Sequence, residues 1–359
     1  MNVLIVGAGP AGSATARLLA EQGHAVSVFE EHEKIGRPIA CTGLVTNVLW
    51  NFVEKDDSFI TNELLGVKVT APSGKELEIP LHEFAICRET FDAHLAKLAI
   101  EAGAQYHTRH KFTRLNNGKA VFAHAGSEHE LPYDLLIGAD GPFSAVGRAA
   151  GLIKDRRYYI GSQATITGDF DPAWFLTFFG NLAPGFFAWA VPENNHQARV
   201  GVASKKNVAR SFELLREKFN GEIIERQAGP IPIYEGARHV QKENIFLVGD
   251  AAGVCKNTTG GGIITGIWNA HILANSLKNK RDYSSALSPL RRELWLHAKL
   301  RTMLDKFSNN DYERLVHWMS KPAVKAILFN HPREYPSKLL WKLAIAEPKL
   351  LAFTKYALA

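Results

Sequence analysis

The sequence predicts an α/β protein, α+β overall, in which a doubly wound Rossmann-like domain is interleaved with an antiparallel β-sheet domain and followed by a C-terminal helical segment. A strand–turn–helix–strand pattern over residues 2–29 predicts the first βαβ unit. The apolar runs 135–138 and 245–248 are typical of buried parallel strands. Between about 158 and 235 the composition becomes aromatic and β-rich, which indicates a second sheet inserted into the first domain.

The N-terminal unit shows the clearest element boundaries. Residues 2–6 form an uninterrupted apolar run, as a buried strand does. A helical pattern extends from about Ala11 to Gln22, and Gly23 ends it. Residues 25–29 are predicted to form the second strand.

Further elements follow from periodicity and turn residues. A hairpin is predicted over 66–80, because apolar residues alternate on both sides of Pro72-Ser73-Gly74. A helix is predicted from Glu89 to Ala102, where apolar side chains share one face. From about 284 onward the chain is predicted to be helical and is rich in Lys, Leu and Trp. Shorter strands are predicted at about 105–113, 119–124 and 128–132.

These elements predict three structural units, two of which are interleaved along the chain. A discontinuous nucleotide-binding domain is built from three pieces, and a β-rich domain that covers a hydrophobic ligand is built from two. The predicted boundaries are 1–65, 85–157 and 236–283 for the nucleotide-binding domain, 66–84 and 158–235 for the β-rich domain, and 284–359 for the helical region.

The composition is that of a soluble globular protein, with 359 residues, 46% hydrophobic and 22% charged. No stretch approaches ~18 uninterrupted apolar residues and no signal sequence follows Met1, so we expect a cytoplasmic location. Cys41, Cys87 and Cys255 lack metal-ligand and disulfide spacing, and no metal site is predicted. The net charge of +6 is dispersed and no nucleic-acid motif is present, so no nucleic-acid partner is expected.

The strongest motif follows the first strand and is Gly7-Ala8-Gly9-Pro10-Ala11-Gly12. In such a pattern Gly7 permits a tight turn, Gly9 lets the backbone approach a pyrophosphate, and Gly12 allows close helix–strand packing. The helix start offers free N–H donors to the phosphates. Glu30 ends the second strand, where its carboxylate can bind ribose hydroxyls. A dinucleotide site is predicted, and this fingerprint alone does not distinguish NAD from FAD.

Two later segments narrow the cofactor, because Asp140-Gly141 and Gly249-Asp250 each follow a buried strand. Together with the fingerprint, in this order and at these separations, they resemble the p-hydroxybenzoate-hydroxylase-type flavoproteins. The resemblance implies a Rossmann-like FAD domain in which Asp140 and Gly141 contact the cofactor. It also implies that Asp250 binds the ribityl chain and that Arg88 lies near the phosphates.

A glycine block follows, in which Gly260, Gly261 and Gly262 precede Ile263 at the start of an apolar helix. Glycines at this point leave backbone N–H groups uncovered. A helix N-terminus there favours the negative charge of reduced flavin, so all four residues are predicted cofactor contacts. A role in helix packing is the alternative.

Three segments resemble the geranylgeranyl reductase family: Pro38-Ile39-Ala40-Cys41-Thr42-Gly43-Leu44-Val45, the block from Gly249 to Gly262, and Phe187-Ala188-Trp189-Ala190-Val191-Pro192. The resemblance covers residue 1 to about 275. It implies an FAD-dependent reductase that saturates C=C bonds of geranylgeranyl or other prenyl chains on lipids, by hydride transfer from reduced flavin. The chain departs from the family pattern at three positions, which are Phe187 in place of Tyr, Val191 in place of Phe and Asn257 in place of Pro.

The same resemblance places Cys41 beside the flavin, at its substrate end. Hydrogenation of an isolated alkene needs a proton as well as a hydride, and a thiol is a candidate donor. An inert buried cysteine is the alternative. Phe175, Phe187, Trp189 and Pro192 are predicted to hold the prenyl chain, with a plain core role as the alternative.

The predicted partner is a hydrophobic isoprenoid or prenyl lipid. No second dinucleotide fingerprint is present, so two electron donors stay open: transiently bound NAD(P)H and a small acidic electron carrier. Residues 338–358 mix Lys with Leu, Trp and Phe, which suits either peripheral contact with a membrane surface or a helix packed on the cofactor domain.

Two other classes of function stay open at this point. A flavin-dependent monooxygenase or halogenase acting on an aromatic substrate shares the Trp-x-hydrophobe-Pro pattern. A non-catalytic prenyl-binding protein shares the fold, but the complete set of Gly7, Gly9, Gly12, Glu30 and Asp250 argues for a bound cofactor.

Overall fold

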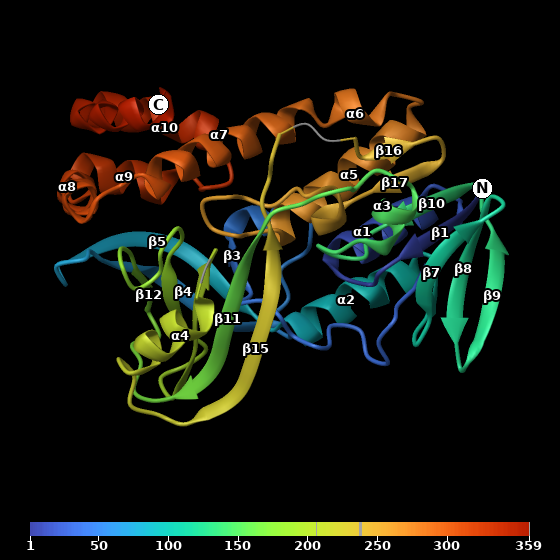
Figure 1. Cartoon of the computed structure of the whole chain (residues 1–359), viewed down its shortest axis with the longest axis horizontal. Coiled ribbons are helices and arrows are strands. Elements are labelled where there is room, and N and C mark those ends of the chain that lie inside the picture. Colours follow the sequence, from blue (N-terminus) through green and yellow to red (C-terminus); the bar gives the residue numbers. More distant parts are fainter. Residues whose placement is uncertain (206, 237–238, 359) are drawn as a thin grey trace.

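A computed structural model describes residues 1–205, 207–236 and 239–358. Residues 206, 237, 238 and 359, which fall in the predicted segments 158–235, 236–283 and 284–359, lie outside the described residues. Figure 1 shows three regions: an α/β region that carries the N-terminus, a large curved sheet, and a group of helices that carries the C-terminus.

The α/β region is built on a six-stranded sheet in which all neighbours are parallel except the β16–β17 pair at one edge. Helix α1 packs on β1 and β2 and contacts two further helices, α2 and α5. The strands, in spatial order, are β16 (Gln241–Lys242), β17 (Ile245–Leu247), β10 (Leu135–Gly138), β1 (Asn2–Val6), β2 (Ala25–Phe29) and β6 (Gln105–His107). The helices are α1 (Pro10–Glu21), α2 (Arg88–Glu101) and α5 (Ile263–Lys278).

Local chemistry explains the first unit. Residues 3–6 of β1 are at most 5% exposed, because the strand lies in the middle of the sheet. Helix α1 begins at Pro10, which suits the first turn because proline has no backbone N–H that would be left without an acceptor there. It ends at Glu21, and the C-cap residue Gln22 is followed by Gly23, which has φ of 82°.

The curved sheet has eight strands, all antiparallel to their neighbours except the parallel pair β12–β4. It joins segments that are far apart in the sequence, as the interleaved arrangement requires. The strands, in spatial order, are β15 (Ile223–Pro232), β11 (Tyr158–Thr167), β14 (Gln197–Ser204), β13 (Ala188–Pro192), β12 (Trp174–Phe178), β4 (Ile60–Thr70), β5 (Glu76–Ile86) and β3 (Leu44–Thr46).

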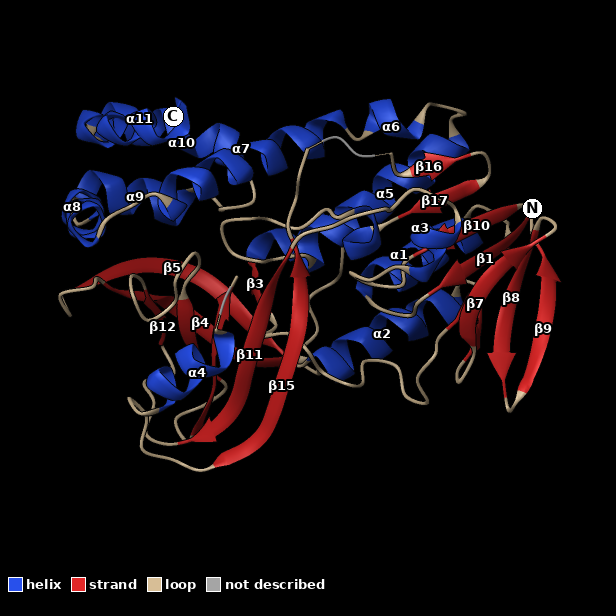
Figure 2. Ribbon diagram, in the orientation of Figure 1, coloured by secondary structure: helices blue, strands red, loops and turns tan. Residues whose placement is uncertain are grey.

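The two faces of this sheet are covered differently. Phe212 and Leu215 of α4 (Val208–Arg216) pack against one face, which is rich in alanine and valine. The other face carries the larger side chains, Phe175 and Trp189 among them, and meets Val316 and Met319 from the C-terminal helices. Figure 2 shows α4 and the C-terminal helices on different sides of the sheet. The second face is therefore the one available to a ligand.

The structure confirms the predicted fold class and alters some element boundaries. The predicted strand 105–113 is two strands in two sheets, because Arg109 takes a left-handed conformation (φ of 59°) between β6 and the next strand. The hairpin is longer than 66–80, and β4 crosses the predicted boundary at residue 65, so the division into domains stays a prediction. The separate three-stranded sheet consists of β7 (Lys111–Asn116), β8 (Lys119–His124) and β9 (Ser127–Pro132).

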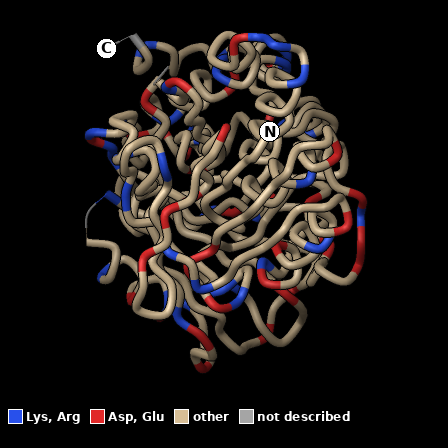
Figure 3. The backbone as a smooth tube through the Cα atoms, turned by 90° about the vertical axis from the view of Figure 1, so that its right-hand side faces the viewer, with Lys and Arg blue, Asp and Glu red and all other residues tan. Residues whose placement is uncertain are grey.

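The C-terminal region is helical, as predicted, and Figure 1 shows it above the curved sheet. None of the helices in the described ranges has the length and hydropathy needed to cross a membrane. In Figure 3, Lys and Arg are interspersed with Asp and Glu along the backbone. The helices are α6 (Tyr283–Ala286), α7 (Ser288–Asp305), α8 (Asn309–Met319), α9 (Pro322–Asn330), α10 (Pro336–Ala346), η3 (Pro348–Thr354) and α11 (Lys355–Leu358). Sequence reasoning did not identify β3, α4, η1 (Asn47–Asn51), α3 (Ala145–Ala149) or η2 (Gly249–Ala252).

Candidate active site

The glycine-rich turn after β1 has the geometry of a phosphate site. Gly7 has φ of 102°, and a Cβ there would strike the carbonyl oxygen of Ala139. A Cβ on Gly12 would strike the Gly7 carbonyl oxygen, whereas Gly9 has open space around it. No side chain caps the start of α1, so its first N–H groups are free for an anion. Ala11 packs instead toward Gly249 and Gly266, which brings α1 and α5 together.

Glu30 is held at the end of β2 by backbone donors. Its Oε2 accepts a hydrogen bond from the Ala8 N–H at 2.9 Å, and its Oε1 accepts one from the His32 N–H at 3.0 Å. Gly7, Gly9 and Glu30 line one cavity of about 500 Å³. A carboxylate fixed beside a phosphate-binding turn matches the requirements of a ribose.

Asp140 and Gly141 line the same cavity from the end of β10. Asp140 Oδ2 accepts a hydrogen bond from the Val146 N–H at 3.0 Å, at the start of α3, while Oδ1 is buried without a partner among the described residues. Burial raises the pKa of this carboxyl group. An unpartnered buried oxygen facing a nucleotide-sized cavity is what a cofactor hydroxyl would satisfy.

Arg88 opens α2 and faces the cavity as well. Its Nε and Nη2 donate to the two Asp92 oxygens at 2.8 and 2.7 Å. Burial acts to lower the pKa of Arg88, but the Asp92 carboxylate and the contact with Cys41 outweigh burial and raise it. Arg88 is therefore a fixed positive charge that can pair with phosphate.

Asp250 lies at the junction with the glycine block. A Cβ on Gly262 would lie 2.6 Å from Asp250 Oδ1, so the block must be glycine for the carboxylate to stay in place. Burial raises the pKa of Asp250, and the charges of Arg88 and Arg156 oppose that rise. Arg156 Nη1 also donates to the Asp250 carbonyl oxygen at 2.7 Å. The start of α5 after Gly262 has no side-chain cap and stays open.

A second cavity, of about 380 Å³, begins where the first ends, because Ala40 lines both. Its wall combines the Cys41 loop, the glycine block and the aromatic strands β12 and β13. A third cavity of about 260 Å³ adjoins the second and continues between β4, β5 and α8. The second and third cavities share Phe175, Thr177, Phe179, Leu304 and Arg333.

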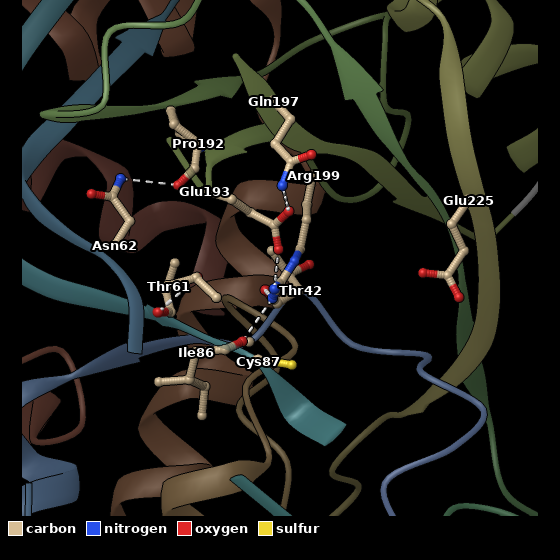
Figure 4. A network of polar contacts seen from close by, with 12 residues as sticks. Thr42, Thr61, Asn62, Ile86, Cys87, Pro192, Glu193, Gln197, Arg199 and Glu225 are labelled. Atoms are coloured by element: carbon tan, nitrogen blue, oxygen red, sulfur yellow. Dashed lines mark hydrogen bonds and ion pairs between the residues drawn. The ribbon is translucent and has the colours of Figure 1, made fainter. Parts of the chain in front are cut away.

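Most of the predicted site residues line these cavities, and a few do not. Phe175, Phe187 and Trp189 face the second cavity, where Trp189 Nε1 donates to Gln163 Oε1 at 3.0 Å. Pro192 does not, because strand alternation directs it with Ala190 to the opposite face of β13. Its carbonyl oxygen accepts from Asn62 Nδ2 at 3.0 Å (Figure 4), and the substrate-contact prediction for Pro192 is not retained. The remaining predicted contacts in the second cavity are Cys41, Gly260, Gly261, Gly262 and Ile263, whereas Pro10, Ala11, Gly12 and Asp250 lie outside the linings of the three cavities.

Sequence reasoning missed a buried charge network in the cavity wall. Lys256 Nζ donates to Glu334 Oε1 at 2.5 Å, and both side chains are at most 5% exposed. Arg333 pairs with Glu83 on β5. Burial alone would raise the pKa of Glu334, but Lys256 and Arg333 lower it to about 2. These pairs join residues far apart in the chain, so no local pattern could have revealed them.

Asn257, which departs from the family pattern, has a structural explanation. Its Oδ1 accepts from the Tyr234 N–H at 2.7 Å and its Nδ2 donates to the Tyr234 carbonyl oxygen at 2.9 Å. The Asn257 amide thus satisfies both backbone groups of Tyr234, as a neighbouring β-strand would. Within the described ranges, no group of three or more His, Cys, Asp or Glu side chains is arranged to hold a metal ion.

Comparison with known proteins agrees with this geometry. An FAD binding domain model matches residues 85–281, and an NAD(P)-binding Rossmann-like domain model matches residues 5–42. The digeranylgeranylglycerophospholipid reductase of Methanosarcina acetivorans is 33% identical over 73% of this chain and 71% of its own length. That of Thermoplasma acidophilum is 30% identical over 93% of this chain and 96% of its own. The chain belongs to the geranylgeranyl reductase family.

As a geranylgeranyl reductase family member, the protein is an FAD-dependent reductase, and the predictions of family and cofactor are confirmed. A solved geranylgeranyl bacteriochlorophyll reductase-like structure from Thermoplasma acidophilum superposes with a TM-score of 0.86 at 25% identity, over 99% of this chain and 98% of that one. A flavin-dependent brominase has a TM-score of 0.71 at 18% identity, over 99% and 100% of the two chains. The second likeness shows a shared fold only.

We predict that Gly12→Ala weakens FAD binding by roughly tenfold or more, because the added methyl group cannot be accommodated between α1 and the Gly7 carbonyl. Flavin absorbance per protein and the FAD dissociation constant measure the effect. Arg17→Ala, on the exposed part of the same helix, is the control and should keep its flavin. Full flavin occupancy in Gly12→Ala would contradict the assigned packing role.

We also predict that Glu334→Gln lowers the free energy of unfolding at pH 7 by about 3 kcal/mol, because it leaves Lys256 buried and unpaired. The folded pKa of about 2 lies below the ordinary value of 4.5, so this stabilisation is present at neutral pH and is lost as pH falls from 4.5 toward 2. Urea titrations measure the free energy of unfolding, and the difference between wild type and Glu334→Gln should be smaller at about pH 3.5 than at pH 7.

The matched control for that prediction is Glu128→Gln, which removes an exposed ion pair with Arg114. Its effect on the free energy of unfolding should be much smaller than that of Glu334→Gln at pH 7, because solvent screens an exposed ion pair. An equal decrease in the free energy of unfolding in Glu334→Gln and Glu128→Gln would contradict the prediction that the buried Lys256–Glu334 pair stabilises the fold more than an exposed pair does.

Proposed function

We propose that this protein saturates C=C bonds in geranylgeranyl-type chains of lipid substrates, with Cys41 as the proton donor. The observation that carries the proposal is the meeting of the nucleotide cavity and the second cavity at Ala40, next to Cys41, which lines the second cavity. Reduced FAD, when bound, supplies the hydride. The names of the relatives, which are reductases of digeranylgeranylglycerophospholipids, support the substrate class.

The residues of the second and third cavities bind the chain and exclude water. Phe175 belongs to both linings, so a long apolar substrate could continue from the Cys41 loop toward α8. Apolar walls of this kind bind a ligand mainly through the apolar surface area that is removed from water, and less through hydrogen bonds. Trp189 cannot rotate freely, since its indole N–H is bonded to Gln163.

Cys41 is proposed to protonate the alkene carbon that does not receive the hydride. The Cys41 side chain lines the second cavity, and its Sγ accepts a weak hydrogen bond from the Gly43 N–H at 3.4 Å. That contact fixes the thiol without consuming its proton. Water is the alternative donor, but the apolar wall disfavours it.

We predict that Cys41→Ala retains FAD and loses alkene reduction by a factor on the order of 10²–10⁴. The assay incubates dithionite-reduced protein with a geranylgeranyl glycerolipid and counts mass gains of two hydrogens per bond. Cys87→Ala is the control, because Cys87 lies outside the three cavity linings. Unchanged turnover in Cys41→Ala would remove this residue from the mechanism, and no reduction in wild type would overturn the proposed function.

Two reductants are proposed as alternatives, transient NAD(P)H and a small acidic electron carrier. The dispersed net charge of +6 is compatible with either. Anaerobic mixing of the oxidised protein with NADPH or with a reduced ferredoxin, followed by flavin absorbance, distinguishes them.

We further propose that α10 and η3 contact an anionic membrane. Trp341 and Ile345, four residues apart on α10, are 56% and 71% exposed, and Leu351 on η3 is 53% exposed. Lys338 and Lys349 are exposed nearby in the chain. Apolar side chains with flanking lysines favour an interface with acidic lipids.

We predict that the double variant Trp341→Ala/Ile345→Ala reduces co-sedimentation with phosphatidylglycerol vesicles by roughly tenfold, since two large apolar groups would no longer enter the interface. Leu65→Ala, which removes an equally exposed apolar side chain on β4, is the control. Equal binding of all three proteins would refute the membrane face.

A further inference from the structure

Arg199, on strand β14, connects the curved sheet to the loop that carries Cys41. Its side chain is 5% exposed. Its Nη1 donates to the Thr42 carbonyl oxygen at 2.6 Å and to the Ile86 carbonyl oxygen at 2.8 Å, and its Nη2 pairs with Glu193. Figure 4 shows Arg199 between Glu193 on one side and the Thr42 and Ile86 carbonyls on the other.

Thr42 is held from a second direction as well. The Thr42 Oγ1 hydroxyl donates to Gln163 Oε1 at 2.6 Å, and Gln163 Oε1 also accepts a hydrogen bond from Trp189 Nε1 at 3.0 Å. Gln163 is held in turn, because its Nε2 donates to Gln227 Oε1 at 2.6 Å. The residue after Cys41 is therefore fixed through its main chain by Arg199 and through its side chain by Gln163.

Gly43, which follows Thr42, is closely packed against its neighbours and restricts the conformation of the loop. It has φ of 70°, and a Cβ there would strike the Ile86 carbonyl oxygen and lie 2.7 Å from Arg199 Nη1. The same residue donates its N–H to Cys41 Sγ. The guanidinium, the Gly43 backbone and the thiol thus form one continuous set of contacts.

We propose that Arg199 is a positioning residue that fixes the Cys41 thiol at the junction of the nucleotide and apolar cavities, an inference that rests on the proposed role of Cys41. Arginine suits the task, because its planar fork serves three acceptors at once, whereas a lysine ammonium on a flexible stem does not. Glu193 directly follows β13, the strand of Trp189. The strand that faces the substrate and the loop of the proton donor are therefore linked through Glu193 and Arg199.

The inference goes beyond a stabilising ion pair, and the test uses a readout that stability alone would not move. Arg199→Lys retains the charge but loses the fork. The double variant Arg199→Met/Glu193→Gln removes both charges, so no buried charge is left unpaired. The FAD-bound protein is prepared in a Cys87→Ala background, which leaves Cys41 and the fully buried Cys255.

The primary measurement is the rate of Cys41 alkylation by iodoacetamide, located by peptide mass spectrometry and followed from pH 6 to pH 9. Release of the loop should raise this rate by roughly tenfold in both variants, with flavin content unchanged. Prenyl reduction should fall on the order of 10²-fold, the cost of about 1 Å of misplacement, mainly in kcat.

Arg301→Met is the matched control. Arg301 is 2% exposed and bonded to Asp305 at 2.7 Å, but it makes no hydrogen bond to the Cys41 loop. It should lose stability without a change in Cys41 alkylation. A wild-type alkylation rate in both Arg199 variants, or an equal rise in Arg301→Met, would overturn the inference. Absence of prenyl reduction in wild type would instead defeat the proposed function, and alkylation would still decide the role of Arg199.

Discussion

The site depends on the close packing of two helix starts, one against a backbone carbonyl and the other against a buried carboxylate. Gly12 of α1 lies against the Gly7 carbonyl, and Gly262 before α5 lies against Asp250. The helices pack together because Ala11 fits between Gly249 and Gly266. Neither helix start has a side-chain cap, so both expose N–H groups. Partial positive charge is thereby concentrated where an anionic dinucleotide binds.

A second constraint concerns charge in an apolar wall. Burying Lys256 and Glu334 costs several kcal/mol per ion before their attraction offsets it. The network nevertheless connects the glycine block to the segment after α9, and Thr46 of β3 donates to Glu334 Oε2 at 2.7 Å. The Lys256–Glu334 ion pair thus connects the C-terminal helices to the segment that carries the glycine block. A region without any recognisable motif becomes part of the wall of the active site.

Sequence reasoning succeeded where a signal is local and failed where a contact is long-range. The Gly7–Gly12 turn and Glu30 could be located because strand, turn and helix follow one another within 30 residues. The interleaved sheet was predictable from its aromatic, alternating segments. Arg199 and Gln163 were not, because the contact that ties each of them to the Cys41 loop is made with Thr42, more than 100 residues away. Pro192 differs for a simpler reason, because alternation along β13 places it on the face opposite to Trp189.

The brominase shares this fold over nearly the whole chain, so the fold cannot decide the chemistry. The pairing of polar groups in the second cavity bears on that choice. Gln163 is occupied by Thr42, Trp189 and Gln227, and Lys256 is occupied by Glu334. A substrate that hydrogen-bonds to Gln163 or Lys256 would have to compete with these internal partners, whereas a prenyl chain has no polar group to satisfy. Two buried polar atoms of lining residues, Thr259 Oγ1 and Arg333 Nε, have no partner among the described residues. A wall whose amide and ammonium groups are already paired, with one thiol beside the nucleotide site, therefore favours an alkene over an aromatic substrate that carries hydroxyl or amino groups.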